Sequence, residues 1–444
     1  MKQLADLDTK STRRGSKRGI RLLVTGIALL AMSAFGATAV GLTGAKCAYE
    51  GLSELTDFGE NPGDLKGFYY VPEGLAANAP LVVALHGCGQ RACDYDNETG
   101  WRQLADDMGF ALLLPEQQKM TIKPGDFAGN PGLCFSWWGF SQKRGFGEPL
   151  SIMNMVKKVV EEHKIDAGRI FVTGLSAGAG MTVRMLAQYP DCFAGGAPVA
   201  GVAYNCAGEV ELSRVGHAIG KDCMCMEGVP EHEQCVAMQE PVPGRTGEVW
   251  GGYVRDVTCG TFALAGGKAC PETADNGRWP RIAVWQGAHD NMVAAINLER
   301  LMLQWTNLHG IDPASATCAE GTSGDECVVG EGDYKTVRRA YADDSGAVMV
   351  QTNLILGTAP DDAPGMLENW AGHASVISSK EDCGCLSVDC ACEKMEEGQA
   401  CLADLRTLFN RDARICQSRL IAAFWGLDKA SAADQAVSKC LHLE

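Results

Sequence analysis

The central motif of the chain reads Arg169-Ile170-Phe171-Val172-Thr173-Gly174-Leu175-Ser176-Ala177-Gly178-Ala179-Gly180-Met181-Thr182. It begins with a β-branched and aromatic run, residues 170–173, of the kind that forms a buried strand. Gly-x-Ser-x-Gly follows, and the apolar-periodic residues after it predict a helix. Strand, tight turn and helix in this order are the context that a nucleophile elbow requires, so Ser176 is the candidate nucleophile.

The spacing of the glycines in this motif has a steric reason. Ser176 has to lie on a strained turn, where a side chain at position 174 or 178 would collide with the neighbouring strand or helix. The helix that begins just after Ser176 points free backbone N–H groups at the site, and such groups favour a developing oxyanion. The alternative interpretation is a glycine-rich turn with a capping serine, which the flanking strand and helix disfavour.

A candidate acid follows Ser176 in the chain. Residues 281–285 predict a strand, and Asp290 stands between it and a helix expected at residues 294–309. A carboxylate just past a strand and before a helix is where the acid of a catalytic triad belongs. Asp290 is therefore preferred over Asp275 and Asp312.

A candidate general base comes later still. Two apolar runs, residues 335–341 and 348–356, predict a hairpin, and His373 follows it in a loop. Catalytic histidines of α/β-hydrolases lie in a loop after the last strand, and the order Ser, acid, His is the order of that fold. The histidines that compete with His373 are expected to be exposed: His217, His232 and His309.

A second backbone donor for an oxyanion is expected in another loop. Residues 80–85 predict a buried central strand that runs directly into His86-Gly87-Cys88-Gly89-Gln90. In an α/β-hydrolase a loop of this kind supplies the second oxyanion N–H. We expect the N–H groups of Cys88 and Ala177 to form the oxyanion hole. His86 is interpreted as a structural residue that holds the loop by hydrogen bonds.

Aromatic residues concentrate in residues 130–140. On a loop near the strand ends, Trp137 and Trp138 could form an apolar platform for substrate. The alternative is that these side chains belong to the core, as aromatics more often do.

The remaining pattern alternates strands and helices, which predicts an α/β-hydrolase fold with a mostly parallel central sheet and helices on both faces. Further strands are expected at residues 67–72 and 110–114, the latter closed by Pro115, and helices at residues 101–108, 151–163 and 418–427. Residues 205–280 and 380–417 are rich in cysteine and predict insertions. We expect residues 46–444 to form a single catalytic domain that carries both.

Residues 1–45 predict an export signal. A basic segment, residues 1–21, precedes residues 22–45, which carry no charge. Small residues allow cleavage after Ala39 or Ala45, and an uncleaved signal anchor is the alternative. We expect a secreted protein, or a periplasmic or membrane-anchored one, whose only membrane tether is this leader.

The charge of the chain narrows the range of partners. The formal net charge is −16, and residues 1–45 carry +5, so the rest of the chain carries −21. An acidic surface argues against nucleic acid and against anionic membranes. Plain solubility explains this charge, and no nucleic-acid partner is expected.

All 20 cysteines stand at or after Cys47, in the part that would be exported. An even number of cysteines in an oxidising compartment indicates disulfides. Candidate bridges between neighbours in the sequence are Cys88 with Cys93, Cys259 with Cys270, and Cys318 with Cys327. Thiolate metal sites are the alternative for the pairs at 223 and 225, 383 and 385, and 390 and 392, but we expect no metal and no cofactor.

Several short motifs lie between about Gly67 and Gly426. They are Leu85-His86-Gly87-Cys88-Gly89-Gln90, Cys134 with Trp137, Gly147-Glu148 with Ser151-Ile152, Gly174-Leu175-Ser176-Ala177-Gly178 with Met181-Thr182, Tyr189-Pro190-Asp191, and Gly372-His373-Ala374. With these motifs the sequence resembles the poly(3-hydroxybutyrate) depolymerase esterases, the branch of α/β-hydrolases that includes feruloyl and acetylxylan esterases.

The resemblance implies hydrolysis of a polyester or small ester by Ser176, Asp290 and His373, with the Cys88 loop in the oxyanion hole. Feruloyl, acetylxylan or other short-chain ester hydrolysis is the alternative, and an exported binding protein on an inactive hydrolase scaffold is another. The family usually reads Gly-Gly-Ala-Met where this chain has Gly178-Ala179-Gly180-Met181, an exchange expected to be harmless. We expect no separate polymer-binding domain of the kind that many extracellular depolymerases add.

Overall fold

The computed structural model describes residues 47–118, 131–138, 144–206, 223–224, 246–264, 279–290, 292–324, 326–329, 335–356, 375–377, 410–412 and 417–428. All of them belong to one compact unit, Gly44–Glu444. The predicted leader, residues 1–45, and most of the two cysteine-rich insertions lie outside the described residues.

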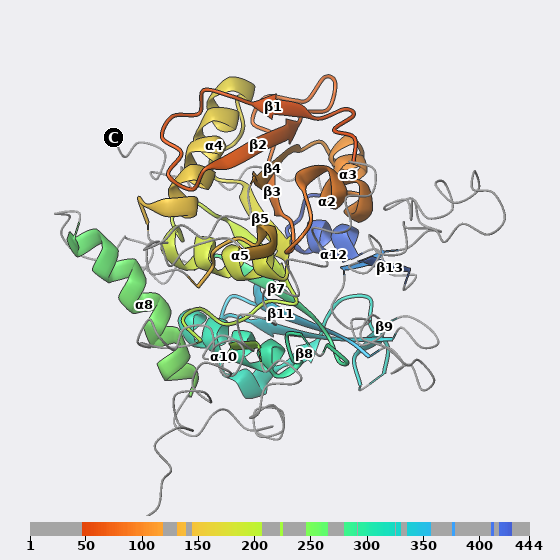
Figure 1. The fold of residues 1–444 in the computed structure, drawn as a ribbon. Coiled ribbons are helices and arrows are strands. Elements are labelled where there is room, and N and C mark those ends of the chain that lie inside the picture. The colour runs from red at the N-terminus through yellow and green to blue at the C-terminus, as the bar shows by residue number, and fades with distance from the viewer. Residues whose placement is uncertain are drawn as a thin grey trace, which may run out of the picture. The chain divides into compact units, whose positions relative to one another are not determined.

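The described strands build one large mixed sheet with a parallel centre (Figure 1). Its order is β1-β2-β4-β3-β5-β6-β7-β11-β10-β8, and β9 pairs with β10. The pairs from β4 through β3, β5, β6 and β7 to β11 are parallel, whereas β1, β2, β8, β9 and β10 pair antiparallel. The strands are β1 Ser53–Leu55, β2 Leu65–Tyr70, β3 Leu81–Leu85, β4 Ala111–Gln117, β5 Ile170–Leu175, β6 Gly195–Val199, β7 Arg281–Gly287, β8 Thr317–Cys318, β9 Val328–Val329, β10 Thr336–Ala342 and β11 Val348–Ile355. β12 Ser375–Ile377 and β13 Asn410–Asp412 form a separate parallel pair.

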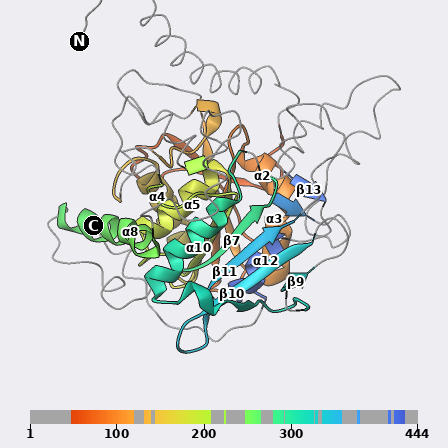
Figure 2. The ribbon, with the colours of Figure 1, turned by 90° about the horizontal axis from the view of Figure 1, so that it is seen from below.

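Helices cover both faces of this sheet, as predicted. Alternate strand residues point to opposite faces: Leu81, Val83 and Leu85 of β3 enter one core, and Val82 and Ala84 enter the other. The helices α4 Gly147–His163, α5 Ala177–Gln188, α8 Gly247–Leu264 and α10 Ile296–His309 pack into the first core. The helices α2 Ala92–Thr99, α3 Trp101–Met108 and α12 Gln417–Phe424 pack into the second (Figure 2).

Most predicted elements are confirmed, but β4 does not stop before Pro115. The strand continues to Gln117, and Pro115 faces Gly67 of β2. Pairing between β4 and β3 ends at Leu113, so Pro115 lies where the strand has a neighbour on one side only. A proline is tolerated there because no central ladder needs its missing N–H.

Helix α8 is a second correction, because the sequence predicts little regular structure between residues 205 and 280. The helix contains Gly247, Gly251 and Gly252, which lower intrinsic helix propensity. It is held instead by its buried side chains, since Trp250 and Val254 are fully buried in the first core. Among the described helices, none is both long enough and apolar enough to cross a bilayer.

Candidate active site

Ser176 lies on a strained turn between β5 and α5, as the motif predicts. Its backbone has φ 56° and ψ −116°, a conformation that residues with a side chain rarely adopt. The turn is fixed to the sheet, because the N–H of Ser176 donates to the carbonyl of Val199 at the end of β6, at 2.9 Å. Strain of this kind persists only where the surroundings enforce it.

The two glycines of the elbow are required by close backbone contacts. A Cβ built on Gly174 would lie 2.6 Å from the carbonyl carbon of Gly178 and 2.7 Å from the carbonyl oxygen of Leu85. A Cβ built on Gly178 would lie 2.6 Å from the carbonyl oxygen of His86, and closer still to that of Leu85. Real Cβ atoms essentially never come so near to backbone atoms, so the steric interpretation of the motif is confirmed.

Gly180 has a different neighbour. A Cβ on this residue would lie 2.6 Å from Cγ of Trp137, so the indole ring packs closely against the first turn of α5. This close contact argues against the expectation that the exchange of two small residues relative to the family pattern is harmless, and the Gly180→Ala variant tests it. With a Cβ at position 180, the Trp137 ring would have to shift from this place.

We expect Gly180→Ala to displace the Trp137 ring while the fold is kept, because a side chain can move where backbone cannot. The KM for p-nitrophenyl butyrate should rise by about threefold to tenfold, which corresponds to about 1 kcal/mol of lost contact. Steady-state kinetics on the purified variant measure this, with Ala179→Gly as the matched variant one residue away. An unchanged KM would show that the ring does not contact substrate.

The loop of residues 86–90, called the oxyanion loop below, lies beside Ser176. A Cβ on Gly87 would lie 3.6 Å from that of Ser176. The loop is held by two short bonds: Gly87 N–H donates to the side chain of Gln90 at 2.7 Å, and Gly89 N–H donates to the carbonyl of Gly132 at 2.6 Å. Within the described part of the chain, the N–H groups of Cys88 and Ala177 donate to no other protein group.

His86 is a structural residue, as predicted. Its ring is fully buried, and its Nε2 accepts the N–H of Gln117 at 3.1 Å. A backbone N–H can only donate, so the ring is neutral and its Nδ1–H donates to the carbonyl of Gly87 at 2.7 Å. Burial lowers the pKa of His86 from 6.5 to about 4, because the charged ring has lost its water.

We therefore expect His86 to stay neutral in the folded protein down to about pH 5. Between pH 6.5 and 4, His86 is protonated in the unfolded chain but stays neutral in the folded protein. The free energy of unfolding therefore decreases as the pH falls through this range. A pKa displaced from 6.5 to about 4 corresponds to about 3 kcal/mol lost across this range. NMR titration of the imidazole signal, assigned by its absence in His86→Asn, checks this; a midpoint near pH 6.5 would contradict it.

The cysteine pairing differs from one predicted bridge and agrees with another. Cys88 is bonded to Cys134, and Cys93 to Cys47, so the predicted bridge between Cys88 and Cys93 is wrong. The sequence neighbours diverge because Cys88 stays in the oxyanion loop while Cys93 is buried in the first turn of α2. The predicted bridge between Cys318 and Cys327 is confirmed, and that between 259 and 270 lies outside the described side chains.

Two groups of cysteines bear on the metal alternative. Cys47, Cys93 and Asp94 come within ligand distance of one another, but the two cysteines are bonded to each other. Cys223 is bonded to Cys206, so it offers no thiolate. The pairs at 383 and 385 and at 390 and 392 lie outside the described residues.

Asp290 lies just past β7, where the sequence places it. The residue is buried, with 5% of its surface exposed. Its Oδ1 accepts the N–H groups of Met292 and Val293 at 2.9 and 2.8 Å, and its Oδ2 accepts from the side chain of Gln286 at 2.9 Å. These bonds hold the carboxylate in one orientation.

The parallel sheet brings Ser176 and Asp290 to the same edge. Both follow the carboxyl end of their strand, and only β6 separates β5 from β7. Neighbouring strands lie about 4.8 Å apart, so the two backbones are separated by about 10 Å, a span that an imidazole between their side chains can bridge. His373 lies outside the described residues, and the triad stays a prediction.

The competing residues are partly placed. His309 is not exposed as expected: it is half-buried, and its Nε2 lies 3.2 Å from the carbonyl of Pro280, which precedes β7. It therefore lies at the opposite edge of the sheet from Ser176. Asp312 follows α10, the helix that ends at His309, and caps a short exposed turn. Asp275, His217 and His232 lie outside the described residues.

The segment of residues 131–138, called the Trp137 loop below, is attached on several sides. Cys134 is bonded to Cys88, and the rings of Trp137 and Trp138 lie 5.3 Å apart, edge to face. Both indoles are half-buried; Trp137 packs against the first core, so it has the contacts of a core residue on one face.

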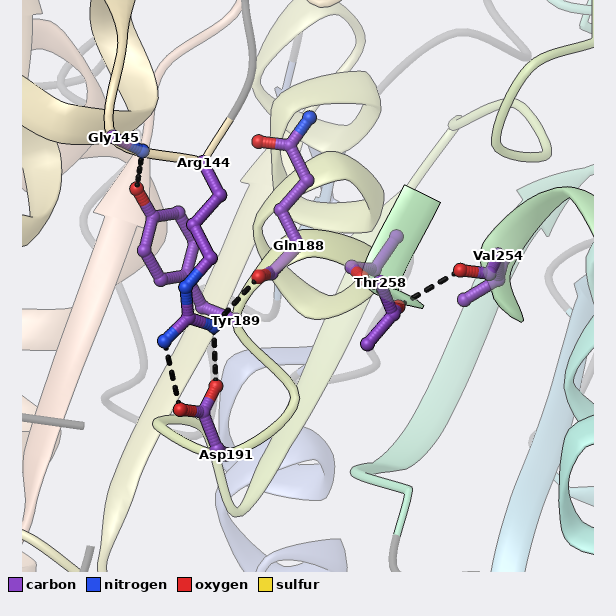
Figure 3. A network of polar contacts seen from close by, with 8 residues as sticks. Arg144, Gly145, Gln188, Tyr189, Asp191, Val254 and Thr258 are labelled. Atoms are coloured by element: carbon purple, nitrogen blue, oxygen red, sulfur yellow. Dashed lines mark hydrogen bonds and ion pairs between the residues drawn. The ribbon is translucent and has the colours of Figure 1, made fainter. Parts of the chain in front are cut away.

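The chain is anchored again just beyond the Trp137 loop. Arg144 forms a two-pronged ion pair with Asp191 at 2.6 and 2.8 Å and donates to the carbonyl of Gln188 at 2.8 Å (Figure 3). The N–H of Gly145 donates to the hydroxyl of Tyr189, whose ring lies under the guanidinium. The Tyr-Pro-Asp motif after α5 therefore fastens this segment, a role that the sequence did not indicate.

A family model described as "Esterase PHB depolymerase" matches residues 65–216, which include the elbow, the oxyanion loop and the Trp137 loop. Poly(3-hydroxyalkanoate) depolymerase C of Paucimonas lemoignei is 38% identical over 262 residues, which are 59% of this chain and 52% of that protein. The chain thus spans about half the length of that relative.

A feruloyl esterase B of Thermothelomyces thermophilus is 30% identical over 268 residues, 60% of this chain and 78% of the relative. Among solved structures, an acetyl xylan esterase from Aspergillus awamori aligns with 69% of this chain and 93% of its own, with a TM-score of 0.48 and 24% identity. From the family match and the two sequence relatives, the chain belongs to the PHB depolymerase family of esterases.

Proposed function

We propose that this chain is an exported serine esterase that hydrolyses the ester bonds of poly(3-hydroxybutyrate) or related polyhydroxyalkanoates. The observation that carries the proposal is the elbow: Ser176 is held at φ 56° beside the oxyanion loop. A nucleophilic serine on a strained turn, next to two backbone donors, is an arrangement made for acyl transfer.

The reaction follows from these parts. Ser176 Oγ attacks the ester carbonyl while His373 takes its proton, and Asp290 orients and stabilises the imidazolium. The N–H groups of Cys88 and Ala177 bind the oxyanion, each contributing about 3 kcal/mol of barrier lowering. The alcohol leaves with the proton from His373, and water then hydrolyses the acyl-enzyme by the same steps in reverse.

The polyester substrate is supported by similarity, since poly(3-hydroxyalkanoate) depolymerase C is 38% identical over the matched region. A feruloyl or acetylxylan esterase is the second candidate, because feruloyl esterase B is 30% identical and is covered over 78% of its length. Export is supported by the predicted leader and by four disulfides among the described residues, since disulfides persist in oxidising compartments.

The test is release of 3-hydroxybutyrate and its oligomers from an amorphous polymer suspension, with p-nitrophenyl butyrate and methyl ferulate assayed alongside. We expect clearance of the polymer by the wild type. Turnover of the soluble esters without attack on the polymer would overturn the proposed polymer substrate and would still support esterase activity. No turnover of any ester would overturn both.

A further inference from the structure

The backbone of the Trp137 loop is held between the buried side chain of Glu148 and the half-buried side chain of Arg184. The N–H of Ser136 donates to Oε2 of Glu148 at 2.8 Å, and Nε of Arg184 donates to the carbonyl of Trp137 at 2.5 Å. Glu148 comes from the first turn of α4, and Arg184 from α5, two turns after Ser176. Two successive residues of the loop are therefore fixed to two different helices.

Glu148 also reaches the oxyanion loop. Its Oε1 accepts from Nε2 of Gln117 at 2.5 Å, and the backbone N–H of the same Gln117 donates to the ring of His86. His86 in turn binds the carbonyl of Gly87. A continuous chain of hydrogen bonds thus runs from the Trp137 loop through Glu148 to the oxyanion loop, parallel to the Cys88–Cys134 disulfide.

Removal from water costs free energy for both ionisable side chains, the buried Glu148 and the half-buried Arg184. Burial raises the pKa of Glu148 from 4.5 to about 7, against hydrogen bonds from Ser136 and Gln117 that lower it. Burial also lowers the pKa of Arg184, while Tyr204 and, to a smaller extent, Glu148 raise it. Charged side chains removed from water are often no more stabilising than apolar residues of the same size, so stability alone does not explain the presence of Glu148 and Arg184.

We propose that Glu148 and Arg184 are positioning residues for ester hydrolysis: together they fix the Trp137 loop, and through it the oxyanion loop, relative to Ser176. The inference rests on the proposed esterase function. Loss of either side chain leaves one end of the Ser136–Trp137 backbone free, so the Trp137 ring and the N–H of Cys88 both lose their fixed position. A displacement of about 1 Å at a reacting centre can cost about a hundredfold in rate.

The test compares Glu148→Ala and Arg184→Met with the conservative variants Glu148→Gln and Arg184→Lys. Glutamine keeps an oxygen for the Ser136 N–H, and the amide of Gln117 can rotate to meet its new NH₂ group. The concentration of active sites is first determined by complete labelling with a fluorophosphonate. For p-nitrophenyl butyrate, kcat is then expressed per labelled site, and KM is measured in the same assay.

We expect kcat per site to fall by about tenfold to a hundredfold in Glu148→Ala and Arg184→Met, with a raised KM, and to recover partly in the conservative variants. Asp96→Ala is the matched control, because Asp96 is also a buried carboxylate, paired with Arg102 at 3.3 Å between α2 and α3. Asp96→Ala should lower the midpoint temperature of unfolding and leave both kcat per site and KM unchanged.

If Glu148→Ala and Arg184→Met both have the kcat per site and the KM of the wild type, the proposal is wrong and the two residues contribute to stability alone. If Glu148→Ala does not fold, Arg184→Met decides by itself, since it acts on the other end of the same backbone segment. A wild type that neither labels nor turns over esters would instead refute the proposed function, so the two failures are distinguishable.

Discussion

Replacing Ser176 with alanine is expected to lower kcat for p-nitrophenyl butyrate by a factor on the order of 10⁵ to 10⁶, because the oxygen that would form the acyl-enzyme is removed. Folding should be unaffected. Alanine meets the same φ of 56° that serine already adopts here, and the backbone bond from residue 176 to Val199 does not involve the side chain.

The experiment compares initial rates and thermal unfolding of the wild type, Ser176→Ala and Ser315→Ala, a change at an exposed serine in a short turn. Ser315→Ala should match the wild type in both measurements. If Ser176→Ala retained more than about a hundredth of the wild-type rate with a full complement of folded protein, Ser176 would not be the nucleophile.

Gly178→Ala is expected to destabilise the protein by about 3 kcal/mol or more and to abolish activity. The added Cβ would overlap the carbonyl oxygens of Leu85 and His86, at the end of β3, and backbone in the centre of a sheet cannot withdraw as a side chain can. The oxyanion loop begins at His86, so any shift that relieves the overlap also moves the N–H of Cys88.

Gly252→Ala is the control for this prediction. Gly252 lies in α8, and nothing stands within 4 Å of a Cβ built there. Alanine should therefore stabilise the helix by up to about 1 kcal/mol. Urea unfolding of both variants gives the two free energies; a Gly178→Ala variant within about 0.5 kcal/mol of the wild type would contradict the steric account.

Local rules predicted the elbow and failed for helix α8. The elbow could be predicted from the sequence because Gly174, Ser176 and Gly178 lie within one turn, whose conformation follows from their spacing and from local steric limits. Helix α8 was not readable, because its glycine-rich sequence is helical only where Trp250 and Val254 enter a core supplied by other elements. The same dependence on neighbours allows Pro115 inside β4.

The role of Glu148 shows why part of the site was hidden. Glu148 and the Tyr189-Pro190-Asp191 motif were recognised as parts of a family pattern, but a pattern along the chain does not indicate what a side chain meets. Ser136 and Trp137 come from one other segment and Gln117 from a second, and only folding brings them to Glu148 and Arg184.

The sequence alone determined four features of this protein: the strained strand-turn-helix around Ser176, the glycines that this turn needs, the position of Asp290 after its strand, and the α/β class of the fold. These depend on interactions between residues close in the chain, whose geometry spacing specifies. Only the tertiary structure decided three other features: the bridge from Cys88 to Cys134, the packing of Trp137 against Gly180, and the bonds of Glu148 and Arg184 to the Trp137 loop. Each joins segments whose meeting depends on how parallel strands align their carboxyl ends at one edge of the sheet.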